Sequence, residues 1–165
     1  MAQELPDLKV LRRCWPEYQD EATTHVVKVN GAAFGGAEPV VIAGPCAIES
    51  YEQTLSVARV VRDAGCKMMR GGVFKPRTNP HSFQGTGLKG LEILARIREE
   101  TGLGVVTEVL DPRLVETVAE VADMIQIGSR SMHNFPLLIE VGKAGVPVLL
   151  KPSWSATLEE WICAA

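Results

Sequence analysis

The sequence lacks a long apolar run and an excess of positive charge, and both absences restrict what it can bind. No stretch approaches the roughly 18 consecutive apolar residues of a membrane-spanning helix, and the amino terminus, MAQELPDLKVLRRCW, has no apolar signal core. Lys and Arg number 17 against 20 Asp and Glu, so the formal net charge is −3. This charge disfavours nucleic acid and anionic membranes as partners. We therefore expect a soluble, cytoplasmic protein.

Paired cysteines and clustered histidines are also missing. His25, His81 and His133 do not have the spacing of metal ligands, and we expect them on the surface or in loops. The cysteines show no CxxC spacing, which favours reduced thiols over a disulfide framework and leaves a metal or catalytic role open for one of them. The four cysteines are Cys14, Cys46, Cys66 and Cys163.

Short apolar runs alternate with helical segments from Val40 onward, which is the pattern of a parallel βα repeat. Residues 1–38 are polar with a glycine-rich end, and we expect a leader that holds a small hairpin at Asn30-Gly31. Residues 39–165 form the repeat. Capping residues and glycine stops predict helices over 50–64, 88–100 and 135–144, and further helices after Asp111 and Thr157.

About five strands are predicted, each followed by a helix. A doubly wound sheet of five strands would suit the length, but it gathers its site at one switch point. Here every strand ends on a reactive residue, as the strands of a barrel do. A complete (β/α)₈ barrel needs roughly 250 residues, whereas this chain has 165. The expected fold is α/β, a (β/α)₈ TIM barrel truncated to about its first five βα units.

The residues at the strand ends predict a binding site. Because the carboxyl ends of parallel strands meet at one face, these side chains are expected to converge. Cys46 follows a Gly-Pro turn that could aim its thiol into a pocket to bind a metal, although a buried thiol without function is the alternative. Glu108 could serve the chemistry or simply pair with a cation. The five strand-end residues are Cys46, Arg70, Glu108, Arg130 and Lys151.

The segment 71–87 is far longer than the usual ~2–6 residues between a strand and a helix. It is rich in Gly and Pro, and it contains Lys75, Arg77 and Thr78. Arg offers a planar fork and Lys a mobile charge, so this composition suits phosphate or carboxylate. A solvated basic loop is the alternative. Together with the strand-end cations, the loop indicates a substrate with several negative charges.

Six segments in this order, VIAGPCAIES, MRGGVFKPRT, SFQG, VVTEVLD, DMIQIGSR and VLLK, resemble the 3-deoxy-D-arabino-heptulosonate 7-phosphate (DAHP) synthases of type I-beta. The resemblance runs from about residue 40 to the last residue. It implies a transferase of the shikimate pathway that condenses phosphoenolpyruvate with erythrose 4-phosphate for chorismate and aromatic amino acid biosynthesis. It also implies a (β/α)₈ barrel, often a homotetramer, and a divalent metal: Mn²⁺, Fe²⁺, Co²⁺ or Zn²⁺.

The same resemblance implies a role for each matching residue. Cys46 would be a metal ligand, and Lys75 and Glu108 would be catalytic. Lys75 would lie between the two substrates, and Glu108 would orient the cations or the reacting water. Phosphoenolpyruvate would be held by the strand-end cations and the backbone of Gly128-Ser129, and erythrose 4-phosphate by the loop. The implied substrate-binding residues are Arg70, Lys75, Arg77, Thr78, Gly128, Ser129, Arg130 and Lys151.

The sequence departs from this family in two respects. The family's other metal ligands, a His, a Glu and an Asp, lie on later strands that this sequence does not contain, so the chain alone is predicted to be inactive. Pro152-Ser153 follow Lys151 where the family usually has Arg-Gly, which is expected to alter that loop. The alternatives are a 3-deoxy-D-manno-octulosonate 8-phosphate synthase, which shares the AGPC opening but lacks KPRT, and a non-catalytic phosphate-binding fragment.

Overall fold

In the computed structural model, residues 26–165 are described, and every structural statement below refers to them. Five parallel strands form one sheet whose strand order, β3-β4-β5-β6-β7, is the order of the sequence. A doubly wound sheet reverses its order at a switch point, so the observed order is that of neighbouring strands in a (β/α)₈ barrel, as predicted. The strands are β3 (Ile42–Ala43), β4 (Met68–Arg70), β5 (Gly104–Glu108), β6 (Met124–Ile127) and β7 (Val148–Leu150).

Five helices follow the strands, and local signals fix their ends. The Ser50 hydroxyl accepts a hydrogen bond from the backbone N–H of Gln53 (3.2 Å) at the start of the first helix. Thr157 and Glu160 form a complete capping box at the last one. After Asp111 the chain first makes a 3₁₀ turn, Pro112–Leu114, where a regular helix was expected. The helices are α2 (Tyr51–Asp63), α3 (Leu88–Thr101), α4 (Val115–Val121), α5 (Phe135–Lys143) and α6 (Leu158–Ala164).

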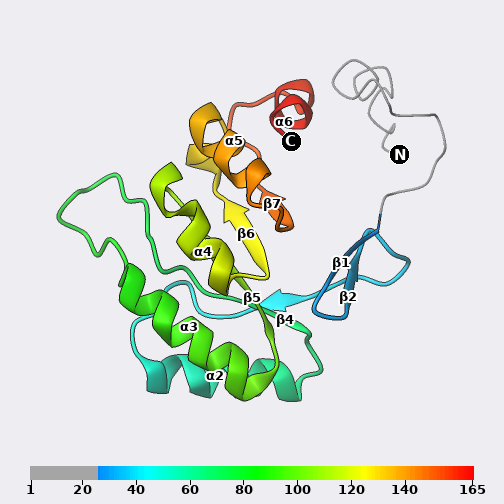
Figure 1. Cartoon of the computed structure of the whole chain (residues 1–165), viewed down its shortest axis with the longest axis vertical. Helices are drawn as coiled ribbons and strands as arrows, with labels where there is room; N and C mark the ends of the chain where they lie inside the picture. Colours follow the sequence, from blue (N-terminus) through cyan, green and yellow to red (C-terminus); the bar gives the residue numbers. More distant parts are fainter. Residues whose placement is uncertain (1–25) are drawn as a thin grey trace.

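The sheet separates two apolar cores, because alternate residues of a strand point to opposite faces. The inner core contains Met68, Val106 and Met124, one from each of β4, β5 and β6. Helices α2 to α5 follow one another along the other face (Figure 1), where they cover the outer core. The outer core includes Met69, Leu94, Val105 and Ile125.

The alternation also sets the positions of the polar residues at the strand ends. Arg70 follows Met68 by two residues, and Glu108 follows Val106 in the same way. Residues two apart on a strand share a face, so both polar side chains stand on the inner face, one step beyond the inner core. The sequence pattern thus places them at the carboxyl ends of the strands.

A hairpin of β1 (Val27–Val29) and β2 (Ala32–Phe34) packs at the amino ends of the strands. Its two-residue turn, Asn30-Gly31, has positive φ at both positions, 45° and 76°, as a type I′ turn requires. The Asn30 amide donates to the carbonyl oxygens of Lys67 (3.0 Å) and Gly102 (2.9 Å), which precede β4 and β5. The hairpin therefore closes the inner core at the end opposite the polar residues. The division of the chain at residue 38 stays a prediction.

The cysteines differ in state. Cys46 and Cys66 are free thiols, but Cys163 is disulfide-bonded, so the expectation of a fully reduced set is wrong at that position. His81 and His133 are exposed, as predicted. The predictions on Cys14, on His25 and on the first part of the leader lie outside the described residues. No helix within 26–165 is long and apolar enough to cross a membrane.

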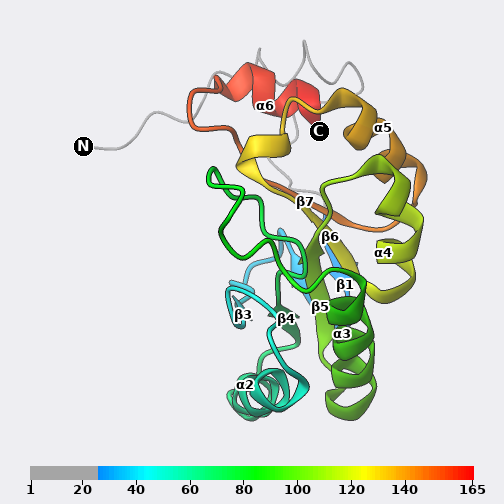
Figure 2. The same cartoon turned by 90° about the vertical axis from the view of Figure 1, so that its left-hand side faces the viewer.

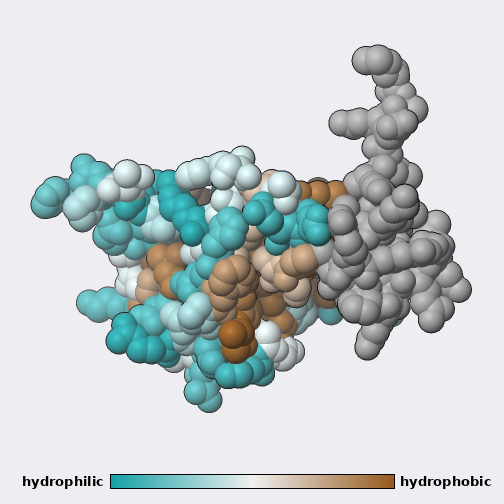
Figure 3. All heavy atoms as spheres, turned by 90° about the horizontal axis from the view of Figure 1, so that it is seen from above, coloured by the Kyte–Doolittle hydropathy of each residue, from teal (hydrophilic) through white to brown (hydrophobic). Residues whose placement is uncertain are grey.

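Large apolar side chains remain exposed around α5, β7 and α6. Phe135 and Ile139 of α5 are 59% and 57% exposed, and Trp154, between β7 and α6, is 80% exposed. Figure 3, which views the molecule from the end where α6 lies, shows apolar surface next to polar surface. This end of the molecule is therefore not a uniformly polar surface.

Candidate functional site

A cavity of about 170 Å³ lies at the carboxyl ends of β5, β6 and β7. This volume is below the ~300–1,000 Å³ of pockets for drug-sized ligands, so the cavity suits a small molecule. Four cations and one carboxylate line it, which favours an anionic ligand. The lining residues are Lys75, Pro76, Arg77, Glu108, Gly128, Ser129, Arg130, Lys151 and Trp154.

Most of the predicted site residues line this cavity, and three do not. Cys46 is absent from the lining but contacts Lys75, which belongs to it. Arg70 is exposed at the end of β4, and Thr78 is exposed in the loop that follows. The structure thus brings seven of the ten predicted site residues together and leaves Cys46, Arg70 and Thr78 outside the cavity wall.

The loop 71–87 doubles back on itself between β4 and α3 (Figure 2). It carries Lys75 to the cavity, and backbone hydrogen bonds hold its two arms together. The N–H of Lys75 donates to the carbonyl of Gln84 (2.8 Å), and the N–H of Gly87 donates to the carbonyl of Val73 (2.9 Å). A loop of this length without such bonds would carry a large ordering entropy. The paired arms therefore hold the backbone of Lys75 in place.

Cys46 and Lys75 are in direct contact. The Lys75 ammonium donates to the Cys46 carbonyl (2.8 Å) and lies 3.3 Å from its Sγ. The hydrogen bond and the charge of Lys75 lower the pKa of the Cys46 thiol, and the charges of Arg70 and Arg77 act in the same direction. A lowered pKa favours the thiolate, which is the form that binds metals.

The metal predicted at Cys46 is not supported by further ligands in the described part of the chain. No group of three His, Cys, Asp or Glu side chains gathers within 26–165. A stable site for Zn²⁺ or a similar ion uses several ligands in fixed geometry. Cys46 can supply one ligand, and the residues present do not hold a metal by themselves.

Glu108 is a buried carboxylate among cations. The residue is 8% exposed, and its Oε2 accepts a hydrogen bond from the Gln126 amide (3.2 Å). Its Oε1 is buried without a partner, and no ion pair within 26–165 includes it. Burial raises the pKa of Glu108, against the lowering effect of Gln126 and of the nearby cations, Lys151 first. The unpaired oxygen can bond a ligand or a water.

Gly128 allows Glu108 to occupy this position. A Cβ at Gly128 would lie 2.1 Å from Glu108 Oε1 and 2.9 Å from its Cδ. The backbone of Gly128, at φ −73° and ψ 161°, is one that any residue adopts. A side chain at position 128 would therefore require the Glu108 carboxylate to move, because the carboxylate fills the volume that a Cβ would take.

Sequence reasoning missed two residues of this site, Gln126 and Trp154. Gln126 is the polar residue in the strand sequence MIQI, and a polar residue inside an apolar strand was a signal that could have marked it as a site residue. Trp154 carried no signal, because its ring reaches Arg130 from another loop, with the Arg130 Cζ 5.1 Å from the ring centroid. The Arg130 guanidinium also donates to the carbonyl of Pro76 (3.4 Å).

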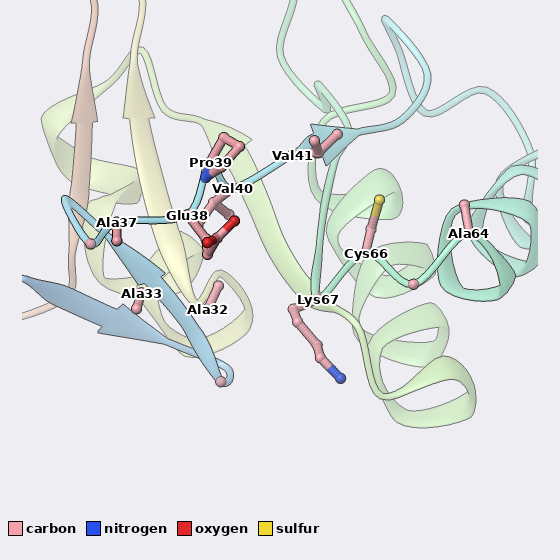
Figure 4. Close-up of a pocket in the computed structure, with 13 residues that line it drawn as sticks. Ala32, Ala33, Ala37, Glu38, Pro39, Val40, Val41, Ala64, Cys66 and Lys67 are labelled. Atoms are coloured by element: carbon pink, nitrogen blue, oxygen red, sulfur yellow. The ribbon is translucent and has the colours of Figure 1, made fainter.

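A second cavity, of about 450 Å³, lies at the opposite end of the sheet. It opens between the hairpin and the turn that follows α2. Figure 4 shows Ala33 and Ala37 on one side and Cys66 on the other. Its charged lining residues are Glu38 and Lys67, and the rest are small or apolar. The cavity at the carboxyl ends, where cations gather, is therefore the candidate site.

Comparison with known proteins agrees with the resemblance read from the six segments. The model of the DAHP synthetase I family matches residues 21–165. A phospho-2-dehydro-3-deoxyheptonate aldolase of Thermotoga maritima is 42% identical over 149 residues, which is 90% of this chain and 44% of that protein. A 2-dehydro-3-deoxyphosphooctonate aldolase of Syntrophotalea carbinolica is 38% identical over 133 residues, 76% of this chain and 48% of that protein.

Solved structures show the same relationship. The crystal structure of the Thermotoga maritima DAHP synthase matches with a TM-score of 0.82 at 40% identity, covering 93% of this chain and 43% of that chain. A truncated form of 3-deoxy-D-arabino-heptulosonate 7-phosphate synthase from the same organism matches with a TM-score of 0.77 at 37% identity, covering 93% and 53%. The chain thus spans about half the length of these relatives, or less.

Proposed function

The chain belongs to the DAHP synthetase I family, and from this membership we propose that it carries part of the active site of a 3-deoxy-7-phosphoheptulonate synthase. The reaction condenses phosphoenolpyruvate with erythrose 4-phosphate to DAHP and phosphate, the first step of the shikimate pathway. The activity is that of a transferase that forms a carbon–carbon bond. The part carried here binds phosphoenolpyruvate and the phosphate end of the sugar.

The convergence of Lys75, Arg130 and Lys151 on one small cavity carries this proposal. Phosphoenolpyruvate bears a phosphate and a carboxylate, and charge-assisted hydrogen bonds from Arg and Lys suit both groups. The second substrate brings another phosphate, so the two substrates repel each other in solution. A cavity rich in cations offsets this repulsion and holds the reacting atoms together.

The chemistry assigns a task to each side chain. Carbon 3 of phosphoenolpyruvate attacks the aldehyde carbon of the sugar, water adds at carbon 2, and the bond from carbon 2 to the phosphate oxygen breaks. Lys75 lies between the two substrates and donates to the developing alkoxide, and Glu108 orients the water through its unpaired Oε1. Arg77 and Thr78 bind the sugar phosphate, and Arg70 assists at phosphoenolpyruvate. Gly128-Ser129 supply backbone donors.

A divalent metal, Mn²⁺, Fe²⁺, Co²⁺ or Zn²⁺, is part of the proposal, with Cys46 as one ligand. The lowered pKa of the Cys46 thiol supports that role. When bound, such an ion would polarise the aldehyde as a Lewis acid. Because the described residues give a single ligand, the tasks assigned above are those of this chain's own side chains. We also propose a homotetramer and a cytoplasmic location. The free thiols of Cys46 and Cys66 agree with a reducing compartment, whereas the disulfide at Cys163 does not.

A calorimetric titration with phosphoenolpyruvate tests the binding proposal. We expect the chain to bind it, and Lys151→Met to weaken binding roughly tenfold or more, because one charge-assisted bond is lost. Lys143→Met is the matched control, since Lys143 pairs with Glu140 on the surface (2.8 Å) and lies outside the cavity. Absence of binding, or equal loss in both variants, would refute the proposal.

A turnover assay separates this proposal from its closest alternative. The octulosonate relatives cover up to about four fifths of this chain at 34–41% identity. The assay pairs the chain with the remaining part of the Thermotoga maritima relative as a second polypeptide. Consumption of phosphoenolpyruvate with erythrose 4-phosphate is the expected result. Preference for arabinose 5-phosphate would instead favour an octulosonate 8-phosphate synthase, and binding without turnover a phosphate-binding module.

A further inference from the structure

Trp154 is an exposed aromatic residue at the edge of the cavity that the cations line. Its ring centroid is 5.1 Å from the Arg130 Cζ, within the ~6 Å at which a guanidinium and an indole attract each other. The residue is 80% exposed, so the ring is not part of the apolar core. Trp154 nevertheless forms one wall of the cavity that contains the cations. Its position is explained by its contact with Arg130.

The loop that carries Trp154 is held in place on both sides of the ring. Before it, the N–H of Ser153 points to the Sδ of Met132 (3.1 Å), and Met132 is fully buried. After it, the N–H of Ala156 donates to the carbonyl of Ser153 (3.2 Å). These bonds close a turn around Trp154. The backbone that carries the ring is therefore held in place beside Arg130.

Apart from the ring, Arg130 has few contacts that hold its guanidinium in place. It forms no ion pair within the described part of the chain, and its hydrogen bond to Pro76 is long, at 3.4 Å. An arginine without a carboxylate partner keeps most of its rotamer freedom and must lose it when it binds a ligand. The ring on one side and the Pro76 carbonyl on the other restrict that freedom in advance. Most of the five N–H donors of the guanidinium stay available to the cavity.

We propose that Trp154 is a positioning residue, which holds the Arg130 guanidinium over the cavity so that its remaining N–H groups meet the phosphate of the bound phosphorylated acid. This role rests on the proposed function, since phosphoenolpyruvate is the ligand in question. The ring contributes in two ways. It reduces the entropy that Arg130 loses on binding, and it excludes water from one side of the charge, which strengthens the attraction to the anion.

The test is a calorimetric titration of phosphoenolpyruvate into four single variants. Trp154→Ala should raise Kd about fivefold, the size of a typical cation–π contribution. Trp154→Phe should restore most of the affinity, because it keeps an aromatic face. Phe135→Ala removes another exposed ring, outside the cavity, and should leave Kd unchanged. Arg130→Ala, the fourth variant, should weaken binding more than Trp154→Ala does.

The double variant Trp154→Ala/Arg130→Ala distinguishes a positioning role from a structural one. If Trp154 acts through Arg130, removing the ring from the Arg130→Ala protein should change Kd no further. A general loss of structure would instead weaken both backgrounds equally. Equal Kd for the unchanged chain and Trp154→Ala would overturn the inference while the proposed function stands.

A measurement without ligand tests the contact between Trp154 and Arg130 directly. The chain has three tryptophans, and Trp154→Phe identifies the indole N–H signal of Trp154 in a nitrogen-resolved NMR spectrum. Arg130→Ala should shift that signal and leave the other two in place. If the unchanged chain fails to bind phosphoenolpyruvate, the proposed function is refuted, and this spectrum still decides the contact. An unmoved Trp154 signal refutes the contact.

Discussion

Replacing Gly128 with Ala introduces one methyl group directly against the buried carboxylate of the candidate site. The new Cβ would lie 2.1 Å from Glu108 Oε1, 2.9 Å from Cδ and 3.3 Å from Oε2. All three atoms belong to one carboxylate, so Glu108 must move as a whole. It cannot move without stretching its 3.2 Å hydrogen bond with Gln126. The backbone at Gly128 accepts alanine without strain, so the carboxylate's displacement is the effect measured.

The expected loss of stability is about 1–2 kcal/mol. Overpacking a buried site costs typically about 1–3 kcal/mol, and alanine recovers about 0.4–1 kcal/mol by restricting the unfolded chain. Urea unfolding measures the sum. Phosphoenolpyruvate binding should weaken as well, because the displaced carboxylate enters a cavity of only about 170 Å³.

Gly142→Ala is the matched control. Gly142 lies in α5, and a Cβ there would meet nothing within 4 Å, so alanine should stabilise the chain by up to about 1 kcal/mol. Glu108→Ala should remove the penalty, so that Gly128→Ala costs nothing further in that background. A Gly128→Ala chain as stable as the unchanged one, with unaltered binding, would show that Glu108 does not occupy this position.

Three further outcomes are expected. The pKa of Glu108 is raised in the folded state from its ordinary 4.5, so the stability that Glu108 contributes is lost as pH rises from 4.5 through the folded pKa. Glu108→Gln should therefore raise the urea midpoint near neutral pH and leave it unchanged in acid. A difference between the two chains that does not depend on pH would contradict the burial of Glu108. Lys75→Met should slow alkylation of Cys46 by iodoacetamide below pH 9.0, because Lys75 lowers the pKa of that thiol. Mass spectrometry with a chelator present measures the alkylation rate, and the rate at Cys66, the internal reference, should not change. Asn30→Gly keeps the positive φ but loses two hydrogen bonds to the sheet, so urea unfolding should show that the free energy of unfolding falls by about 1–3 kcal/mol. Asn30→Ala should lower it further, because alanine is strained at that φ. Equal stability of all three chains would mean that Asn30 does not hold the hairpin on the sheet.

Local signals in the sequence were enough to predict much of the fold. The caps at Ser50 and Thr157 depend on hydrogen bonds within one turn, so neighbouring residues determine them. The strand-end position of Glu108 follows from the two-residue period of a strand, which is also local. These features do not depend on how distant parts of the chain meet.

The parts that the sequence did not reveal depend on distant contacts. Gly128 and Glu108 meet across neighbouring strands, and nothing near either residue in the sequence indicates that a Cβ at position 128 would lie 2.1 Å from the carboxylate. Trp154 meets Arg130 between two loops. The loop 71–87 leaves Thr78 exposed while carrying Lys75 inward, a difference that its composition does not encode.

The sequential order of the strands has a consequence for how the chain folds. Each strand of the sheet after β3 pairs with the strand that precedes it in the chain, so on the ribosome every later strand emerges next to a partner that is already synthesised. Pairings between near neighbours in sequence lower the contact order, and this shortens the search for the native state. The sheet can therefore grow strand by strand in the order of synthesis, after the hairpin that precedes the first parallel strand in the chain.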